Sequence, residues 1–298
     1  MNFLSINDLS KSQILEIFRI TDSLKSKKPK KTTSLKKTLA LLFEKPSTRT
    51  RTSFEAAAFM LGCNTIYLDA AKLQVSRGET YEDTGKILGL YVDFIAARLF
   101  SQKDLVSMAN SSDAVIINAL TDLEHPCQAL SDMYTIREIR GVKKTKIAFM
   151  GDIGANTANS LMLAATKLGA EVSLVGPESA VNKKILRQAS KQGKVSLSEE
   201  VKEGLSGADI VYTDTFVSMG QENDAVKRKR LFSKYQLNSR VLSYANKDAK
   251  VMHCLPAHRG EEITAEVLEG PRSIIYQQAK NKMFVEAALL LFLSRSKH

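Results

Sequence analysis

The segment Phe43–Gly62, FEKPSTRTRTSFEAAAFMLG, combines hydroxyl and guanidinium groups in a way that suits the binding of an anion. The apolar run TLALLF before it predicts a strand, and apolar residues at helical spacing within it predict a helix. Ser47–Thr50 then stand at a helix N-terminus, where unpaired backbone N–H groups and the helix dipole favour negative charge. The guanidinium of Arg49 or Arg51 can add two parallel hydrogen bonds to such an anion. The segment predicts a phosphate-binding turn, although hydroxyl residues also cap helices that bind no ligand.

The order STRTR within FEKPSTRTRTSFE resembles the carbamoyl-phosphate signature of the aspartate and ornithine carbamoyltransferase family. By this resemblance, Ser47, Thr48, Arg49 and Thr50 bind carbamoyl phosphate. The family transfers a carbamoyl group to an amine and requires no cofactor and no metal. The rest of the chain must therefore supply donors to the carbonyl oxygen and a site for the amine.

A second polar set stands in TDLEHPCQALSDMYTI, where Pro126 suits the first position of a predicted helix. His125 and Gln128 then share a face, and the helix dipole keeps His125 neutral enough to donate a hydrogen bond. Taken alone, a histidine before a proline is also a common structural cap. HPCQ resembles the family's HPxQ element, and Arg98, in AARLF, matches a third carbamoyl-phosphate contact. The resemblance thus implies that Arg98 and His125 act on the carbonyl oxygen in catalysis.

The second half of the chain resembles the ornithine branch of the family, in VYTDTFVSMGQE and MHCLPAHRGEEIT. The resemblance implies that Asp214 and Ser218 hold the α-amino group of the acceptor and that Met219 adds a backbone contact. Cys254 and the carbonyl group of Leu255 are implied at the δ-amine, beside carbamoyl phosphate, with Cys254 among the catalytic residues. An acidic side chain suits a cationic amine, whereas without the resemblance Asp214 reads as a turn residue after a strand.

Two positions are assigned less directly. Asn156, in GDIGANTANS, is implied at the carboxylate of ornithine, although this turn has Ala155 where many relatives have an asparagine. Lys282 stands where the family usually has an arginine that contacts carbamoyl phosphate. A lysine keeps the charge and loses the planar fork of donors.

The reaction implied is attack by the neutral δ-amine of L-ornithine on carbamoyl phosphate, which yields citrulline and phosphate. Putrescine and an acylated ornithine stay open as alternative acceptors. The loop Leu73–Gly89 resembles one that reaches into a neighbouring subunit's site, with Arg77 as the residue lent. We therefore expect a homo-oligomer, a trimer or a multiple of trimers.

Strand-like and helical segments alternate from Thr38 onwards, which predicts an α/β fold of two domains, each a mainly parallel sheet flanked by helices. We expect a carbamoyl-phosphate-binding domain at 1–140, joined by a C-terminal helix at 280–298, and an ornithine-binding domain at 141–279. The further strands expected are NTIYLD, FIAARLF and AVIINAL in the first half, and TKIAFMGD, AEVSLVGP, ADIVYTD, VMHCLP and RSIIYQQ in the second.

Composition sets the remaining expectations for this chain of 298 residues. The net charge of +11 favours anionic partners in general, but the basic stretches Lys25–Lys37 and Lys227–Arg230 lack aromatic neighbours and are expected to be solvated surface. Nucleic-acid binding is thus only a remote alternative. Three separated cysteines predict neither disulfides nor a metal site. Without a membrane-length apolar run or a targeting pattern at the N-terminus, we expect a cytoplasmic protein with no membrane partner.

A dinucleotide-binding unit is the competing interpretation of IAFMGDIGANTANS and the strand that follows it. Gly151 and Gly154 give the spacing GxxG, whereas such a site needs GxGxxG. Glu178 is a poor candidate for the acidic residue that would hold a ribose. We expect no nicotinamide cofactor.

Overall fold

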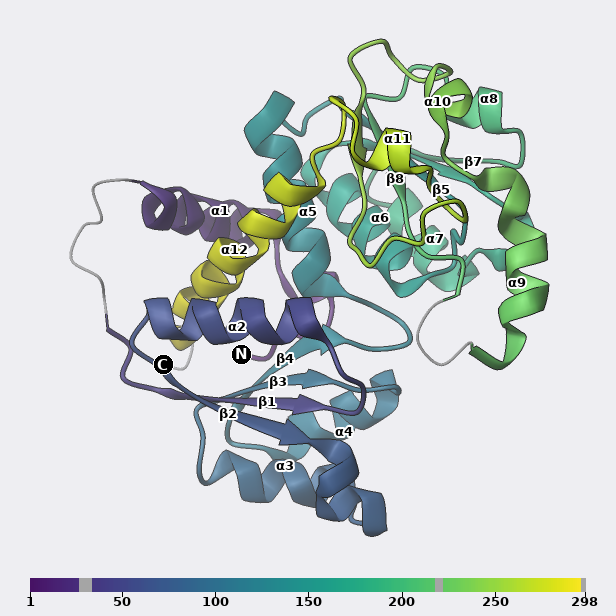
Figure 1. Cartoon of the computed structure of the whole chain (residues 1–298). Coiled ribbons are helices and arrows are strands. Elements are labelled where there is room, and N and C mark those ends of the chain that lie inside the picture. Colours follow the sequence, from purple (N-terminus) through teal and green to yellow (C-terminus); the bar gives the residue numbers. More distant parts are fainter. Residues whose placement is uncertain (27–33, 218–221, 296–298) are drawn as a thin grey trace. The chain divides into compact units, whose positions relative to one another are not determined.

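Two parallel sheets organise the chain (Figure 1). The computed structural model describes residues 1–26, 34–217 and 222–295. One compact unit comprises Met1–Ser131 with Lys280–His298, and the other comprises Asp132–Ala279. The division lies inside helix α5 (Pro126–Arg140), whereas the sequence predicted it just after that helix. The predicted class, two α/β domains with helices flanking parallel sheets, is confirmed.

The first sheet has the strand order β2-β1-β3-β4, and all of its strands run parallel. Its strands are β1 (Thr38–Phe43), β2 (Asn64–Asp69), β3 (Phe94–Arg98) and β4 (Val115–Leu120). Its helices are α1 (Lys11–Lys25), α2 (Thr48–Met60), α3 (Tyr81–Gly89), α4 (Gln102–Ser111), the start of α5 and the end of α12 (Ile275–Arg295), with short 3-10 turns η1 (Ile6–Asp8), η2 (Ala70–Lys72) and η3 (Gln74–Arg77). In Figure 1, α2 crosses one face of this sheet and α3 and α4 cover the other.

Burial on both faces explains the apolar strands of the first sheet. Five of the six residues of β1 and all six of β4 are buried, as expected of parallel strands covered on both sides. The edge strand β2 is more exposed. Phe54, Ala57, Ala58 and Leu61 of the α2 segment are buried, which confirms the helical spacing predicted there.

The second sheet has the order β7-β6-β5-β8-β9 and is also parallel throughout. Its strands are β5 (Lys146–Met150), β6 (Glu171–Val175), β7 (Val195–Ser198), β8 (Ile210–Thr213) and β9 (Lys250–Met252). The helices and turns of this unit, besides the end of α5 and the start of α12, are α6 (Asn156–Leu168), η4 (Glu178–Ala180), α7 (Lys183–Ser190), α8 (Val201–Leu205), η5 (Glu222–Asp224), α9 (Ala225–Phe232), η6 (Ser233–Tyr235), α10 (Ser239–Leu242) and α11 (Ala265–Leu268).

The prediction of a strand at RSIIYQQ was wrong. Only Ser273 forms a bridge, to Val251, and α12 begins at Ile275. Ile275 and Gln278 are buried while Tyr276 is 72% exposed, so the burial follows a helical rather than an alternating period. The sequence analysis also missed β7, a strand of four residues at the edge of the second sheet.

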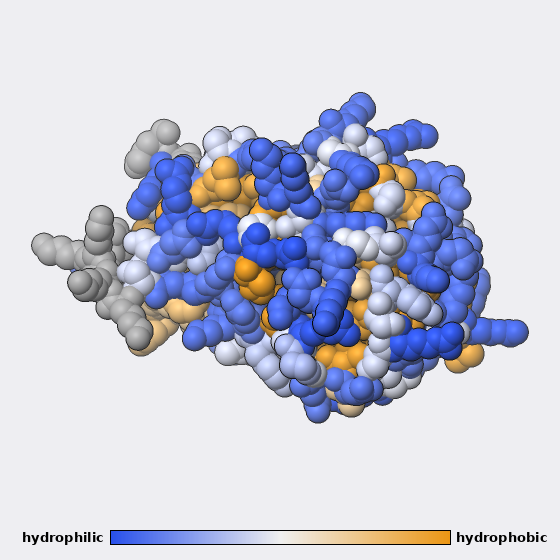
Figure 2. Space-filling model, turned by 90° about the horizontal axis from the view of Figure 1, so that it is seen from above, coloured by the Kyte–Doolittle hydropathy of each residue, from blue (hydrophilic) through white to orange (hydrophobic). Residues whose placement is uncertain are grey.

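The surface, the helices and the cysteines bear on the expectations from composition. Figure 2 shows one face of the molecule, where hydrophilic residues predominate and hydrophobic ones form separate patches. Within the described ranges, no helix is both long and apolar enough to cross a bilayer. The three cysteines are free thiols, but only Cys127 is fully buried, whereas Cys63 and Cys254 are half-buried.

Candidate active site

The strand order of each sheet reverses at one point, and the predicted site residues follow the strands there. In the first sheet β1 lies between β2 and β3; Ser47 follows β1, and Arg98 ends β3. In the second sheet β5 lies between β6 and β8; Asn156 follows β5, and Asp214 follows β8. Open α/β sheets bind ligands outside the carboxyl ends of their strands at such switch points. Each unit therefore presents a candidate site at this edge of its own sheet.

In the first unit, the turn after β1 forms the N-terminus of α2. Ser47 is the N-cap, and its hydroxyl oxygen accepts a hydrogen bond from the backbone N–H of Thr50 at 3.3 Å. Thr48 and Arg49 are exposed in the first turn, and Thr50 is buried. The first-turn N–H groups and these side chains have the donors and the positive charge that suit an anion at this end of the helix.

The structure distinguishes the two arginines of this turn. The Nε of Arg51 donates to Glu55 at 3.0 Å, and its guanidinium lies 3.7 Å from the ring centroid of Tyr67. These contacts hold the Arg51 side chain between Glu55 of α2 and Tyr67 of β2. Arg49 is thus the arginine that suits a bound anion at the start of the helix.

Lys282 joins the residues from α2 and α5 into one group. Its side chain is buried, and its Nζ donates to Gln128 Oε1 at 2.9 Å and to Thr50 Oγ1 at 3.4 Å. Thr50, Gln128 and Lys282 are widely separated in the sequence, and all belong to the first unit. Three residues that the sequence assigned to carbamoyl phosphate therefore lie in direct contact.

His125 lies immediately before α5 and is buried. Burial lowers the pKa of His125 well below its usual value, and the nearby cations Lys282 and Arg98 lower this pKa further. Desolvation and the two cations thus add to the helix dipole as causes of a neutral His125. At neutral pH the imidazole is uncharged, and a neutral imidazole can donate a hydrogen bond through one ring nitrogen.

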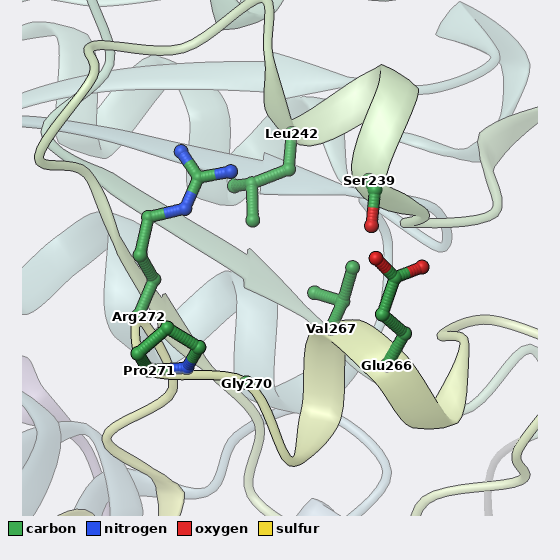
Figure 3. Close-up of a pocket in the computed structure, with 7 residues that line it drawn as sticks. All are labelled: Ser239, Leu242, Glu266, Val267, Gly270, Pro271 and Arg272. Carbon is green, nitrogen blue, oxygen red and sulfur yellow. The ribbon is translucent and has the colours of Figure 1, made fainter.

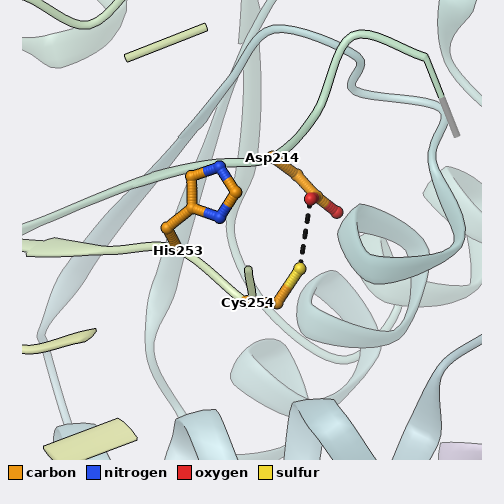
Figure 4. A group of neighbouring side chains, drawn as sticks. All are labelled: Asp214, His253 and Cys254. Carbon is orange, nitrogen blue, oxygen red and sulfur yellow. Dashed lines mark hydrogen bonds between the residues drawn. The ribbon is translucent and has the colours of Figure 1, made fainter. Parts of the chain in front are cut away.

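In the second unit, Asp214 and Cys254 meet at the ends of β8 and β9 (Figure 4). The Cys254 Sγ donates to Asp214 Oδ1 at 3.1 Å, and the backbone N–H of Thr215 donates to the same oxygen at 2.8 Å. Asp214 is only 7% exposed. A desolvated carboxylate of this kind favours a cationic partner.

The turn after β9 is held by a buried histidine. Leu255 has a left-handed backbone (φ 59°), and its N–H donates to His253 Nδ1 at 2.9 Å. His253 Nε2 therefore carries the proton and donates to Glu262 Oε1 at 3.1 Å. These bonds orient the backbone of Leu255 and the adjacent thiol of Cys254.

Asp214, His253 and Cys254 each have a potential ligand atom, all within 4.8 Å of one another, as a metal site would require (Figure 4). However, both ring nitrogens of His253 already form hydrogen bonds, to Leu255 and Glu262. A metal ion would have to break one of these bonds. The group suits the recognition of an amine better than metal binding.

Comparison with known proteins identifies the family. The model of the aspartate/ornithine carbamoyltransferase carbamoyl-phosphate-binding domain matches residues 1–138, and that of the aspartate/ornithine-binding domain matches residues 143–293. The chain belongs to the aspartate/ornithine carbamoyltransferase family.

Individual relatives align with most of the length of this carbamoyltransferase. The ornithine carbamoyltransferase of Bacillus subtilis is 42% identical over 299 residues, covering 97% of this chain and 92% of the relative. That of Hyperthermus butylicus is 46% identical over 264 residues, covering 86% of this chain and 84% of the relative. The solved ornithine carbamoyltransferase of Pyrococcus furiosus has a TM-score of 0.92 at 40% identity, over 98% of this chain and 96% of that one. The anabolic enzyme of Campylobacter jejuni has a TM-score of 0.93 at 38% identity, over 99% of each chain.

Four further predicted site residues of the carbamoyltransferase complete the set. Ser218 and Met219 lie outside the described residues. Arg77 is exposed at the end of η3. Asn156 is half-buried as the first residue of α6, and its Oδ1 accepts a hydrogen bond from Thr157 Oγ1 at 3.3 Å.

A buried ion pair that was not predicted from the sequence lies beside Asp214. Asp152, in the turn after β5, is 4% exposed and forms an ion pair with Arg228 of α9, whose Nε also donates to the Phe216 carbonyl at 2.9 Å. Burial raises the pKa of Asp152 to about 6, against the opposing effect of Arg228. Arg228 belongs to the stretch Lys227–Arg230, so the expectation that this whole stretch is solvated was wrong. An acidic residue directly after a strand at the switch point was the available signal.

One pocket of the second unit contains none of the predicted residues (Figure 3). Glu266 and Val267 of α11 and Arg272 line it with Ser239 and Leu242 of α10. The pocket lies beside the short helices α10 and α11 rather than at the ends of β5 and β8. It is therefore a different feature from the candidate site.

Proposed function

We propose that this chain transfers the carbamoyl group of carbamoyl phosphate to the δ-amine of L-ornithine, with L-citrulline and phosphate as products. The observation that carries the choice of ornithine is the contact of the buried Asp214 with the half-buried Cys254 at the switch point of the second sheet. A desolvated carboxylate favours a cationic α-amino group, whereas an aspartate acceptor would call for more basic side chains. The ornithine carbamoyltransferases similar over most of the chain support the same choice.

Carbamoyl phosphate binds at the start of α2. Its phosphate is anchored by Ser47, Thr48, Arg49 and Thr50, because the first-turn N–H groups and the guanidinium favour a dianion there. Lys282 adds a point charge, supported by its contacts with Thr50 and Gln128.

The carbonyl group of carbamoyl phosphate is polarised by Thr48, Arg98 and His125. Negative charge grows on the carbonyl oxygen as the amine attacks, so donors aimed at that oxygen stabilise the transition state more than the ground state. A neutral His125 donates without releasing its proton to the intermediate, and the nearby cations help to keep it neutral. Collapse of the tetrahedral intermediate expels phosphate.

Ornithine binds in the second unit. Asp214 and Ser218 hold its α-amino group, Met219 adds a backbone contact, and Asn156 meets its carboxylate. Cys254 and the Leu255 carbonyl lie at the δ-amine and select its neutral form. A free alkyl amine with a pKa of about 10.4 is only about 0.04% neutral at pH 7, so this selection and the alignment of the two substrates supply much of the rate.

The active assembly is a homo-oligomer, a trimer or a multiple of trimers, in which Arg77 of one subunit completes a neighbour's site. Exposure of Arg77 at the end of η3 supports this role. We further propose that the protein works in the cytoplasm, in arginine metabolism, without a metal, a cofactor or a nucleic-acid partner. A fully active monomer in sedimentation would contradict the shared site.

A citrulline-formation assay tests the proposed function. Carbamoyl phosphate is supplied with L-ornithine, putrescine, N-acetylornithine or L-aspartate in parallel, and the expected result is turnover with ornithine alone. Preference for another amine would keep the phosphate site and overturn the assignments of Asp214 and Asn156. An absence of turnover with all four would refute carbamoyl transfer.

A further inference from the structure

A buried carboxyl group lies beside the proposed phosphate site, where a second anion is unexpected. Glu286 of α12 is 0% exposed and stands one helical turn after Lys282, whose Nζ lies 3.8 Å from Glu286 Oε1. Neither carboxylate oxygen of Glu286 accepts a well-aligned hydrogen bond from the residues that the structure describes, although the Ser53 hydroxyl lies close enough to favour the ionised form. A buried carboxylate without hydrogen bonds is destabilising, and Lys282 offsets part of that effect.

Three elements bring groups to face Glu286. On α12 itself the facing cation is Lys282. From α5 comes Cys127, whose thiol pKa is raised by burial and by the charge of Glu286. From α2 comes Ser53, whose hydroxyl opposes the effect of burial on the pKa of Glu286 and also donates to the Thr50 carbonyl at 3.2 Å. Burial raises the pKa of Glu286 to about 7, against the opposing effect of Lys282, so the carboxyl gains or loses its proton near neutral pH.

Lys282 is shared between Glu286 and the proposed phosphate site. Its ammonium has three donors. Two of them point to Gln128 of α5 (2.9 Å) and to Thr50 in the first turn of α2 (3.4 Å). A phosphate dianion bound there would place two anionic groups around one buried ammonium. Like charges this close favour protonation of the weaker acid, which is Glu286.

We propose that Glu286 is a proton-linked counter-ion of Lys282. Its carboxylate neutralises the ammonium while no phosphate is bound, and it takes one proton from solvent when a phosphate dianion binds. No covalent bond of the substrate changes in this step. Glu286 is a positioning residue, because it acts through Lys282 and does not touch the substrate. The inference rests on the proposed function, since it takes Thr50, Gln128 and Lys282 as part of the carbamoyl-phosphate site.

The proton linkage predicts how affinity depends on pH. If the bound dianion keeps Glu286 protonated, the apparent dissociation constant is inversely proportional to the fraction of free protein in which Glu286 is protonated. With a pKa of about 7, the affinity is within about 1.1-fold of its maximum near pH 6 and is weakened about 30-fold near pH 8.5. Replacement of Glu286 by glutamine keeps the side-chain shape in its uncharged form and abolishes this dependence.

Titration calorimetry of the full-length protein tests the proposal, with phosphonoacetamide as a stable analogue of carbamoyl phosphate. Two buffers of different ionisation heat give the number of protons taken up. Near pH 8.5 the wild type should take up about one proton more than Glu286→Gln. The variant should bind up to about 30-fold more tightly than the wild type near pH 8.5, and equally near pH 6. Glu171→Gln, which disrupts an exposed ion pair with Lys194, is the matched control and should behave as the wild type.

Equal proton uptake by wild type and Glu286→Gln would overturn the proposal, and so would a failure of the wild type to bind phosphonoacetamide. Weaker binding by the variant at every pH would also overturn it, because Glu286 would then only hold Lys282 in place. If the variant does not fold, infrared difference spectroscopy of the wild type near pH 8.5 decides instead. Binding should produce the carbonyl band of a protonated carboxyl group, and its absence would refute the linkage.

The citrulline assay keeps the two hypotheses distinguishable. A wild type that takes up the proton on binding the analogue but forms no citrulline would refute the proposed reaction and leave the role of Glu286 intact. Citrulline formation without excess proton uptake would refute only the role of Glu286.

Discussion

Replacement of Asp214 by asparagine removes a negative charge with little change of structure. Asp214 Oδ1 accepts hydrogen bonds from the Thr215 N–H (2.8 Å) and the Cys254 thiol (3.1 Å). An asparagine in the same rotamer retains an Oδ1 acceptor for both donors. The residue is 7% exposed, so water replaces little of the lost interaction. The substitution therefore tests the charge and not the fold of the turn.

The expected effect is a loss of ornithine affinity. A hydrogen bond to a charged group contributes about 1.5–3 kcal/mol, which corresponds to a rise of about 10- to 150-fold in the KM for ornithine. The KM for carbamoyl phosphate should stay within about twofold, because the residues assigned to it at the start of α2 belong to the other unit.

Steady-state citrulline formation, with each substrate varied at saturation of the other, measures both constants. Asp248→Asn is the matched control, because the Asp248 side chain is 80% exposed and lies 3.9 Å from Arg140 at the surface. It should leave both KM values unchanged. An unchanged KM for ornithine in Asp214→Asn would refute the assignment of Asp214 to the α-amino group, and equal rises in both KM values would indicate a general disturbance.

Three further predictions concern pH and packing. The kcat/KM for ornithine should rise from pH 6 to 9, because the neutral amine becomes more abundant while His125, whose pKa is lowered, stays neutral; a flat profile would contradict this. Because burial raises the pKa of Asp152 from 3.8 to about 6, its folded form binds the proton more tightly than the unfolded chain. This group's contribution, about 3 kcal/mol, is fully present below about pH 4 and is lost as pH rises through about 6. Denaturant titrations of wild type and Asp152→Asn at both pH values should show that difference, and parallel pH dependences would refute it. Gly154→Ala should greatly reduce the yield of folded protein, since its Cβ would lie 1.9 Å from the Ala180 carbonyl oxygen; a wild-type melting temperature would contradict the close approach.

The fold was largely predictable because parallel strands buried on both faces are apolar along their length. TLALLF and AVIINAL were predicted as strands for this reason. TLALLF is an inner strand of the first sheet, and every residue of β4 within AVIINAL is buried. The strand predicted at RSIIYQQ was wrong because a short apolar run does not distinguish a strand from the first turn of a helix. Burial of Ile275 and Gln278 with exposure of Tyr276 settled the helix, and that pattern depends on what α12 packs against.

The candidate site shows the same division between local and tertiary information. Ser47 and Thr50 cap a helix whose start follows from the local sequence, so the phosphate-binding turn could be predicted directly. The contact of Arg51 with Glu55, four residues later on the same helix, is local, whereas its contact with Tyr67 depends on the neighbouring strand β2 and could not be predicted from a motif.

The sequence by itself determined the family, the two α/β domains and the residue types assigned to the two substrates, because these follow from motifs and from the periodic spacing of apolar residues. Only the tertiary structure decided the charge states. It buried His125 beside Arg98 and Lys282, and it placed Glu286 against the same lysine. Desolvation and charge proximity depend on atoms brought together from distant parts of the chain, so the pattern of residues along one segment does not encode them.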